Sequence, residues 1–186
     1  MSVAIVPAAG KAERFGGGKL VADVGGEPLL NRTLRSLLEG GVDHLVVVLP
    51  PGAAMPTVEL LNDERVLRVV NPDPSRGMFS SIQIGLASAN GDPILVLPGD
   101  MPFVQPATVQ KVLSEATRTG RIVSPRYQGR RGHPVAFPQR LRDGILKADA
   151  ASTLNDALKK AGASLEVDVN DQAIRRDVDL PRDIAP

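Results

Sequence analysis

The chain has 186 residues, 42% of them hydrophobic and 23% charged, which is ordinary for a globular protein and predicts one domain over residues 1–186. The formal net charge of +1 gives no general attraction to nucleic acid or membranes. No apolar run approaches the ~18 residues of a membrane span. We therefore expect that the protein binds neither nucleic acid nor a membrane and that it is cytoplasmic. The absence of cysteine excludes disulfides, thiolate zinc sites and cysteine nucleophiles, and two histidines leave few ways to build a Ser-His-Asp triad.

Strand-like runs alternate with helical patterns through the first half of the chain. Apolar runs predict strands over residues 3–6, 44–49, 66–70 and 93–97, and helical spacing predicts helices over residues 28–39, 57–61 and 78–89. The almost wholly apolar runs are typical of strands buried on both faces of a parallel sheet. The repetition predicts a three-layer α/β fold with a Rossmann-like, doubly wound, mostly parallel sheet and right-handed crossovers.

The second half of the chain is less regular. Its predicted helices cover residues around 109–116, 141–146 and 154–161, and its predicted strands cover residues 121–124, 135–137, 165–169 and 176–178. Residues 125–134 would form a loop or a hairpin turn between two of these strands. No internal repeat or linker divides the chain.

A glycine-rich, basic segment follows the first predicted strand. Four glycines, one arginine and two lysines fall within residues 10–19. Glycines allow the backbone to approach a ligand closely and to point its N–H groups inward, and Arg14 and Lys19 supply positive charge. We therefore expect this segment to bind a polyphosphate; a flexible surface loop is the alternative.

The spacing excludes two well-known glycine motifs. A P-loop that starts at Gly10 would need glycine where Phe15 stands, and a hydroxyl residue where Leu20 follows Lys19. A dinucleotide fingerprint would need glycine at Ala12 and an acidic residue ~20 positions further on. The segment therefore belongs to neither class.

A second candidate follows the predicted strand 93–97. Asp100 stands between Gly99, which permits close approach, and Pro102, which stiffens the exit. In open α/β sheets ligands lie outside the carboxyl ends of the strands, so Asp100 would face the same crevice as the glycine-rich segment. Mg²⁺ takes one or two carboxylates together with substrate phosphates, and Asp100 is the predicted ligand. An ordinary Asp-x-Pro turn is the alternative.

These segments resemble signature motifs of the MobA-like nucleotidyltransferases. The resemblance is carried by Pro7-Ala8-Ala9-Gly10, Arg14-Phe15-Gly16, Lys19-Leu20 and the metal-aspartate motif Leu97-Pro98-Gly99-Asp100-Met101-Pro102. Residues 77–82, 131–135 and 177–183 extend it, in the right order, over almost the whole chain. Within the family the chain is most similar to the molybdenum cofactor cytidylyltransferases, because the guanylyl-transferring branch typically has L-A-G-G at residues 7–10.

The resemblance implies a GT-A-like nucleotidyltransferase fold and the transfer of CMP from CTP to the phosphate of a molybdopterin-type cofactor, with Mg²⁺ (or Mn²⁺) bound and pyrophosphate released. It implies that Lys19, Arg14 and Asp100 are catalytic and that Asp100 and Asp179 hold the metal. The implied nucleotide-binding residues are Ala8, Ala9, Gly10, Arg14, Gly16, Gly17, Lys19, Asn71, Gly77, Ser80 and Ser81. Arg131 and His133 would bind the second substrate. A molybdoenzyme or its maturation chaperone is a further expected partner.

Some of these roles have alternatives. Asn71, Gly77 and the two serines precede or open a predicted helix, where they serve equally well as helix caps. A basic loop such as that around Arg131 is more often solvated than ligand-bound. At residues 149–153 the family's G-D-x-G-A-R pattern keeps its aspartate but loses the second glycine and the arginine. The acceptor could therefore be another phosphate compound, such as a sugar phosphate or phospholactate, or the donor GTP. A non-catalytic cofactor-binding accessory protein is the alternative of another class.

Overall fold

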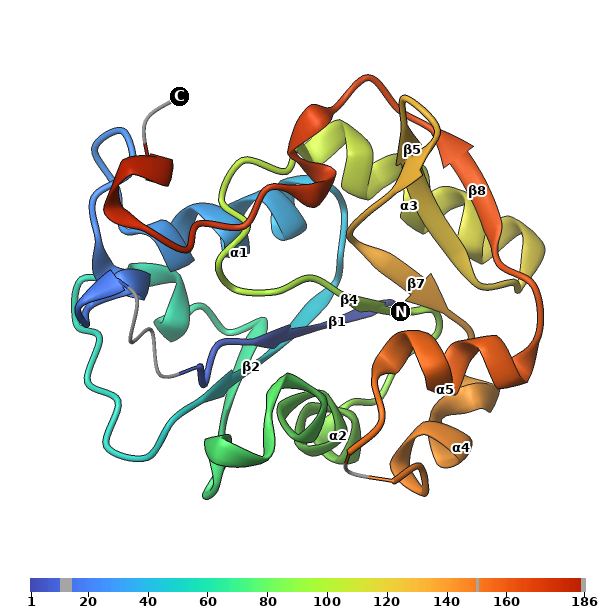
Figure 1. Ribbon diagram of the computed structural model, residues 1–186, viewed down its shortest axis with the longest axis horizontal. Helices are drawn as coiled ribbons and strands as arrows, with labels where there is room; N and C mark the ends of the chain where they lie inside the picture. The colour runs from blue at the N-terminus through green and yellow to red at the C-terminus, as the bar shows by residue number, and fades with distance from the viewer. Residues whose placement is uncertain (11–14, 150, 185–186) are drawn as a thin grey trace.

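A mixed sheet of eight strands runs through the molecule and carries helices on both faces (Figure 1). The computed structural model describes residues 1–10, 15–149 and 151–184. The strands follow the order β3-β2-β1-β4-β7-β5-β6, and β8 pairs with β5. The parallel strands of the first half are β1 (Val3–Pro7), β2 (His44–Leu49), β3 (Val66–Val70) and β4 (Ile94–Val96). The later strands are β5 (Val123–Tyr127), β6 (Arg130–Arg131), β7 (Val135–Phe137) and β8 (Leu165–Asp168). Of these, β7 is antiparallel to β4 and β5, whereas β8 is parallel to β5.

The helices divide between the two faces of the sheet (Figure 1). On one face lie α1 (Leu29–Glu39) and α3 (Pro106–Thr119), and on the other lie α2 (Met78–Ser88), α4 (Arg142–Leu146) and α5 (Leu154–Ala161). The short 3₁₀ helices are η2 (Lys19–Val21), η3 (Glu59–Asn62), η4 (Pro74–Arg76), η5 (Gln139–Leu141), η6 (Gln172–Arg175) and η7 (Pro181–Ile184). No helix in the described part of the chain is long and apolar enough to cross a membrane.

Alternation along β1 separates the core into two layers. Ala4 of β1 belongs to the apolar cluster that contains Leu34 of α1, whereas Ile5 belongs to the cluster that contains Leu86 of α2. All four side chains are fully buried. Burial of one large apolar side chain contributes ~1.5–3 kcal/mol relative to its exposure, so the two-sided burial of β1 anchors the strand that leads into the glycine-rich segment.

Two glycines let helices pack closely. A Cβ added at Gly85 of α2 would lie 2.5 Å from Ile5 Cγ2 and 3.0 Å from Val48 Cγ2, so the helix lies directly on β1 and β2. A Cβ at Gly40, after α1, would lie 2.5 Å from Val109 of α3. Larger residues at these positions would push the helices away from the sheet or from each other.

The predicted α/β fold class is confirmed, and the main elements of the first half lie within one or two residues of their predicted bounds. The predicted helix 57–61 is instead the 3₁₀ helix η3. The predicted strand 121–124 begins later, at Val123, and continues through residue 127 because Arg126 pairs in register with Asp168 of β8. A turn at Gln128 and Gly129, both with positive φ, then leads into β6, which makes this part a hairpin.

The predicted strand 176–178 is wrong. This segment is irregular, and the N–H of Val178 donates to the carbonyl of Asp100 at 2.9 Å rather than to a sheet neighbour. The side chain of Val178 is buried in a small cluster with Val24 and Leu29. Its apolar character therefore reflects anchoring to a turn and a helix, not strand formation.

Candidate active site

The strand order reverses at β1, which lies between β2 and β4. The chain first builds β2 and β3 on one side of β1 and then returns to place β4 on the other side. Ligands of open α/β sheets lie at the carboxyl ends of the strands at such a point. The glycine-rich segment follows β1 and Asp100 follows β4, so the topology brings the two predicted segments together.

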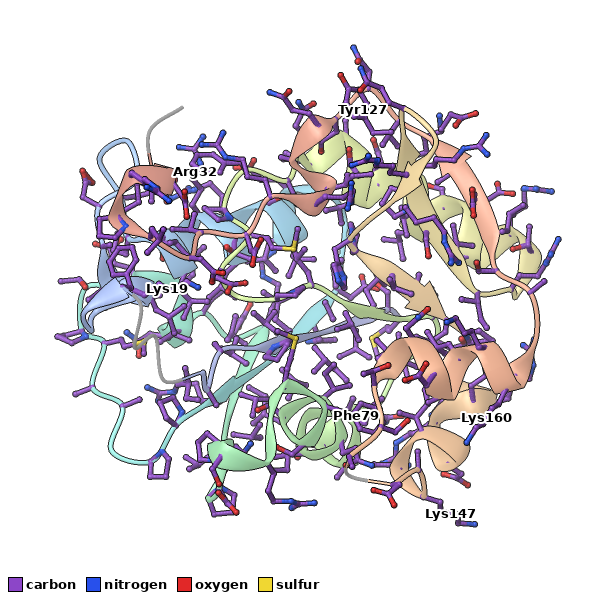
Figure 2. The ribbon with its side chains drawn as sticks, in the orientation of Figure 1. Lys19, Arg32, Phe79, Tyr127, Lys147 and Lys160 are labelled. Carbon is purple, nitrogen blue, oxygen red and sulfur yellow. The ribbon has the colours of Figure 1, made fainter. Side chains whose placement is uncertain are left out.

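Lys19 lies between two carboxylates at this point. Its Nζ is 2.8 Å from Asp100 Oδ2 and 3.3 Å from Asp179 Oδ1. Lys19 is only 8% exposed, and Figure 2 labels it near the C-terminal segment. Gly16 and Gly17 precede it with φ of +84° and +94°, in the region that favours glycine, and lead the chain into η2. A buried ammonium needs compensating charge, which the carboxylates supply.

Backbone contacts fix the turn that carries Asp100. The N–H of Gly99 donates to the carbonyl of Pro7 at 3.0 Å, and Thr33 Oγ1 of α1 donates to the carbonyl of Gly99 at 3.0 Å. A Cβ at Gly99 would lie 3.0 Å from Ala8 Cβ, so glycine permits the close approach of the two strand ends. Asp100 Oδ1 is buried and has no hydrogen-bond partner among the described residues.

A third carboxylate joins the cluster from the C-terminal segment. Asp177 and Asp179 flank Val178, whose backbone is tied to Asp100, and carboxylate oxygens of Asp100, Asp177 and Asp179 lie within 4.8 Å of one another. The carboxylate of Asp183 accepts the N–H groups of Asp179 (3.1 Å) and Leu180 (2.7 Å), which fixes the end of this segment. Three clustered oxygen ligands suit Mg²⁺ or Mn²⁺. Sequence reasoning missed Asp177, although the Asp177-Val178-Asp179 pattern offered it as an equal candidate.

A small cavity of about 170 Å³ adjoins this cluster. Its lining includes the predicted residues Ala8, Ala9, Gly10, Lys19, Gly77, Ser81 and Asp100. The structure therefore brings these residues together around one space. The exposed Gly16 and Gly17 do not line it, and Arg14 lies outside the described residues.

Asn71 and Ser80 lie behind the cavity rather than in its wall. Asn71 Nδ2 donates to Ser80 Oγ at 3.0 Å and to Ser81 Oγ at 2.9 Å, and Ser80 Oγ donates to the carbonyl of Gly77 at 2.7 Å. Asn71 and Ser80 are fully buried. Their polar groups are thus engaged in holding the start of α2, and of this group Gly77 and Ser81 face the cavity.

A second and much larger cavity, of about 1210 Å³, lies between α2, α5 and the β5–β7–β8 part of the sheet. Its wall combines apolar side chains such as Phe79 and Leu158 with charged ones such as Arg131 and Glu166. Gly77 and Met78, at the start of α2, line both cavities. The two cavities therefore meet at the N-terminus of α2.

His133 and Arg131 both line the larger cavity, but they differ in burial and in their hydrogen-bond partners. Burial lowers the pKa of His133, whereas a hydrogen bond to the backbone of Val96 and the negative charges of Asp100 and Asp177 act in the opposite direction. His133 Nδ1 is buried without a hydrogen-bond partner among the described residues. Arg131 already has partners, because its guanidinium lies 3.4 Å from Glu166 Oε1 and donates to Ser164 Oγ at 2.9 Å.

The segment that departs from the family pattern also reaches the larger cavity. Ala151, Ser152 and Thr153 line it, and Thr153 caps α5 by accepting the N–H of Asp156 at 3.1 Å. Asp149 accepts the N–H of Ala151 at 2.8 Å. The changed residues therefore alter the wall of this cavity and not that of the smaller one.

The fold and the position of the carboxylate cluster define a doubly wound α/β protein with a ligand site at the reversal of strand order. Rv0371c of Mycobacterium tuberculosis has this fold, with a TM-score of 0.81 at 23% identity over 98% of this chain and 95% of that one. That protein has also been solved in complex with manganese. The chain belongs to the family with the MobA-like NTP transferase domain, whose model matches residues 4–166.

Curated relatives carry different substrate names. A probable molybdenum cofactor guanylyltransferase of Thermococcus sibiricus is 26% identical over 121 residues, which cover 65% of this chain and 59% of that protein. A 2-C-methyl-D-erythritol 4-phosphate cytidylyltransferase of Frankia casuarinae is 30% identical over 181 residues, which cover 94% of this chain and 61% of that protein. The chain thus spans less than two thirds of the length of either relative.

Proposed function

We propose that this protein is a Mg²⁺- or Mn²⁺-dependent nucleotidyltransferase that moves CMP from CTP to the phosphate of a molybdopterin-type acceptor. One observation carries the proposal: Lys19 and the cluster of Asp100, Asp177 and Asp179 adjoin the smaller of two cavities that meet at the start of α2. A donor nucleotide in the smaller space and an acceptor in the larger one would meet at this charge cluster.

The reaction that suits these residues is an in-line displacement. An oxygen of the acceptor phosphate forms a bond to the α-phosphorus of CTP, the bond between the α-phosphorus and its bridging oxygen breaks, and pyrophosphate leaves. The attacking phosphate is already an anion, so the site needs no general base, and its task is to bring two anions together. Lys19, together with Arg14, would neutralise the triphosphate.

The three clustered carboxylates are the residues that would hold a divalent cation. Their oxygens are hard ligands, and the buried, unpartnered Oδ1 of Asp100 is available for coordination. When bound, the cation would supply charge neutralisation to the phosphate oxygens. Ala8, Ala9 and Gly10 would line the nucleotide through backbone groups, as their place in the wall of the smaller cavity allows.

The larger cavity supports a bulky acceptor. Ligand pockets typically measure about 300–1,000 Å³, and this cavity of about 1210 Å³ combines apolar walls with cationic residues, as a planar, phosphate-bearing molecule requires. Arg131 and His133 would receive the acceptor phosphate; Arg131 would then exchange or share its contact with Glu166. A sugar phosphate or phospholactate would leave most of the space unfilled. A molybdoenzyme or its maturation chaperone would take the product.

The choice of CTP as the donor rests on residues 7–10, which are Pro-Ala-Ala-Gly. The named relatives include both a cytidylyltransferase and a guanylyltransferase, so the donor needs its own test. Pyrophosphate release with Mg²⁺ tests the proposal, using CTP, GTP, ATP and UTP against molybdopterin, a sugar phosphate and phospholactate. We expect the fastest release with CTP and molybdopterin. A faster reaction with GTP would overturn the donor, and a faster reaction with a smaller acceptor would overturn the acceptor.

The variant Asp100→Asn and the matched control Asp143→Asn, an exposed carboxylate on α4, complete the test. We expect the first to lose at least about 10²–10³-fold in rate while keeping its fold by circular dichroism, and the second to retain full rate. Absence of release from every pair, combined with tight molybdopterin binding, would favour the accessory protein over the enzyme.

A further inference from the structure

Lys19 occupies the position of a cation within the carboxylate cluster. Its Nζ contacts Asp100 Oδ2 at 2.8 Å and Asp179 Oδ1 at 3.3 Å, and both carboxylates belong to the cluster whose oxygens lie within 4.8 Å of one another. A magnesium ion lies about 2.0–2.1 Å from each oxygen ligand. A metal bound through Asp100 Oδ2 and Asp179 Oδ1 would therefore lie very close to the present position of the ammonium. The two cations cannot share these two oxygens.

The ammonium fills this site incompletely. Asp100 Oδ1 and His133 Nδ1 are buried and have no hydrogen-bond partner among the described residues, although the imidazole lies close enough to feel the charges of Asp100 and Asp177. Buried polar atoms normally have partners, and a metal ion with its bound waters supplies such partners to surrounding groups. The two unpartnered atoms thus suit a hydrated divalent cation, whose bound waters would reach groups that the ammonium does not contact.

The ammonium group of Lys19 also has an alternative position, in the smaller cavity. Its side chain lines the smaller cavity together with Ala9 and Gly10, where the proposed function places the triphosphate. The lysine side chain has a flexible four-carbon stem, so the ammonium can move from the carboxylates to a phosphate by rotation about side-chain bonds. A triphosphate would compete with the carboxylates for this one charge.

We propose that Lys19 holds the metal site closed in the nucleotide-free protein and that the triphosphate opens it by withdrawing the ammonium. The inference rests on the proposed function, because it takes the donor to be a triphosphate and the carboxylate cluster to be its metal site. It makes nucleotide and metal positively coupled: each binds the free protein weakly, and each strengthens the other. The metal is therefore loaded together with the nucleotide rather than before it.

Binding of Mn²⁺ tests this coupling without reference to turnover. Free Mn²⁺ is measured by electron paramagnetic resonance for the wild type and for Lys19→Gln, first alone and then with α,β-methylene-CTP. We expect Lys19→Gln to bind Mn²⁺ about tenfold or more tightly than the wild type in the absence of nucleotide. The nucleotide analogue should raise the Mn²⁺ affinity of the wild type by a similar factor and that of Lys19→Gln much less.

The matched control is Lys147→Gln, which removes an exposed lysine far from Lys19 (Figure 2) and should bind Mn²⁺ like the wild type. Lys19→Met repeats the test with an apolar side chain, and thermal unfolding identifies any variant that fails to fold. Equal Mn²⁺ affinity of the wild type and both folded Lys19 variants would overturn the inference and leave the proposed function intact. Absence of Mn²⁺ binding to every variant, with the analogue present, would overturn the metal site and with it the proposed function.

Discussion

Asp177 contributes a carboxylate oxygen to the cluster although its residue is exposed. Its position follows from Val178, whose buried side chain and whose N–H bond to Asp100 leave the two flanking aspartates at the site. The fixed backbone between Asp177 and the half-buried Asp179 therefore holds both carboxylates at the cluster.

We expect Asp177→Asn to weaken Mn²⁺ binding in the presence of a CTP analogue by about tenfold or more. Substitution of a residue that only supports a metal ligand typically lowers metal affinity 10–100-fold, so substitution of a direct ligand should lower it at least as much. Isothermal titration of Mn²⁺ measures the effect, with Asp143→Asn as a control of equal charge change. An unaltered affinity would restrict the metal ligands to Asp100 and Asp179.

Sequence reasoning reached Lys19 and Asp100 because each follows a predicted strand, and strand ends meet at one edge of a parallel sheet. The structure joins them at 2.8 Å across 81 positions of sequence. The same reasoning could not reach the pairing of Arg131 with Glu166, because it depends on how β6 and β8 lie beside β5. For Asn71 and Ser80 it left two equal roles, nucleotide ligand or helix cap, and the hydrogen bonds of both residues in the structure are made to neighbouring protein groups.

At the scale of elements, β1 and β2 are joined at their starts by Ser2 and Asp43. The backbone N–H and the Oγ of Ser2 both donate to Asp43 Oδ2, at 2.7 and 2.9 Å, and lower the pKa of Asp43 from its usual 3.8. A lowered folded-state pKa contributes stability that is present above the unfolded value and is lost as pH falls through the folded value.

We expect Asp43→Asn to reduce the free energy of unfolding by about 1 kcal/mol at pH 7, a modest amount because the carboxylate is exposed. The difference from the wild type should shrink as pH falls below 3.8 and disappear below the folded pKa. Urea unfolding across this range measures both the size of the difference and its dependence on pH. A difference that stayed constant with pH would exclude the ionised carboxylate as its cause.

Gly132 fixes the η6 segment against the loop between β6 and β7. A Cβ at Gly132 would overlap the carbonyl oxygen of Ile174, which also accepts the N–H of His133 at 2.7 Å. Because η6 leads into Asp177 and Asp179, this contact helps to place the carboxylate cluster. The Arg-Gly-His-Pro motif, interpreted from sequence as substrate-binding, thus has a packing role at its glycine.

We expect Gly132→Ala to destabilise the protein by about 1–3 kcal/mol, as overpacking of a close contact typically does, and to weaken Mn²⁺ binding. The matched control is Gly144→Ala on α4, where an added Cβ meets nothing within 4 Å. That substitution should be neutral or stabilise the helix by about 0.5–1 kcal/mol. Thermal unfolding of the two variants tests the contact. Similar melting temperatures would show that the η6 backbone can move away from the added Cβ without loss of stability.

At the scale of the whole molecule, the parallel half of the sheet was predictable and the mixed half was not. Uninterrupted apolar runs such as 45–49 are typical of strands buried on both faces, which favours strands between helix layers. The antiparallel insertion of β7 beside β4, and the pairing of β8 with β5, are non-local contacts between short strands. No local pattern specifies such partners, and the larger cavity lies among these elements.

The meeting of two cavities at α2 predicts that donor and acceptor binding can be perturbed separately. Ala163 is exposed and lines only the larger cavity, so Ala163→Phe would narrow it without disturbing the core. We expect this variant to raise the KM for the acceptor severalfold while leaving the KM for CTP unchanged, since only contacts to the acceptor are altered.

The control Ala161→Phe adds the same ring at the end of α5, outside the lining of either cavity, and should leave both constants unchanged. Steady-state pyrophosphate release at saturating concentrations of the other substrate measures each constant. If only the KM for CTP rose, the larger cavity would be the donor site and not the acceptor site. If neither KM changed, the acceptor would bind elsewhere on the molecule.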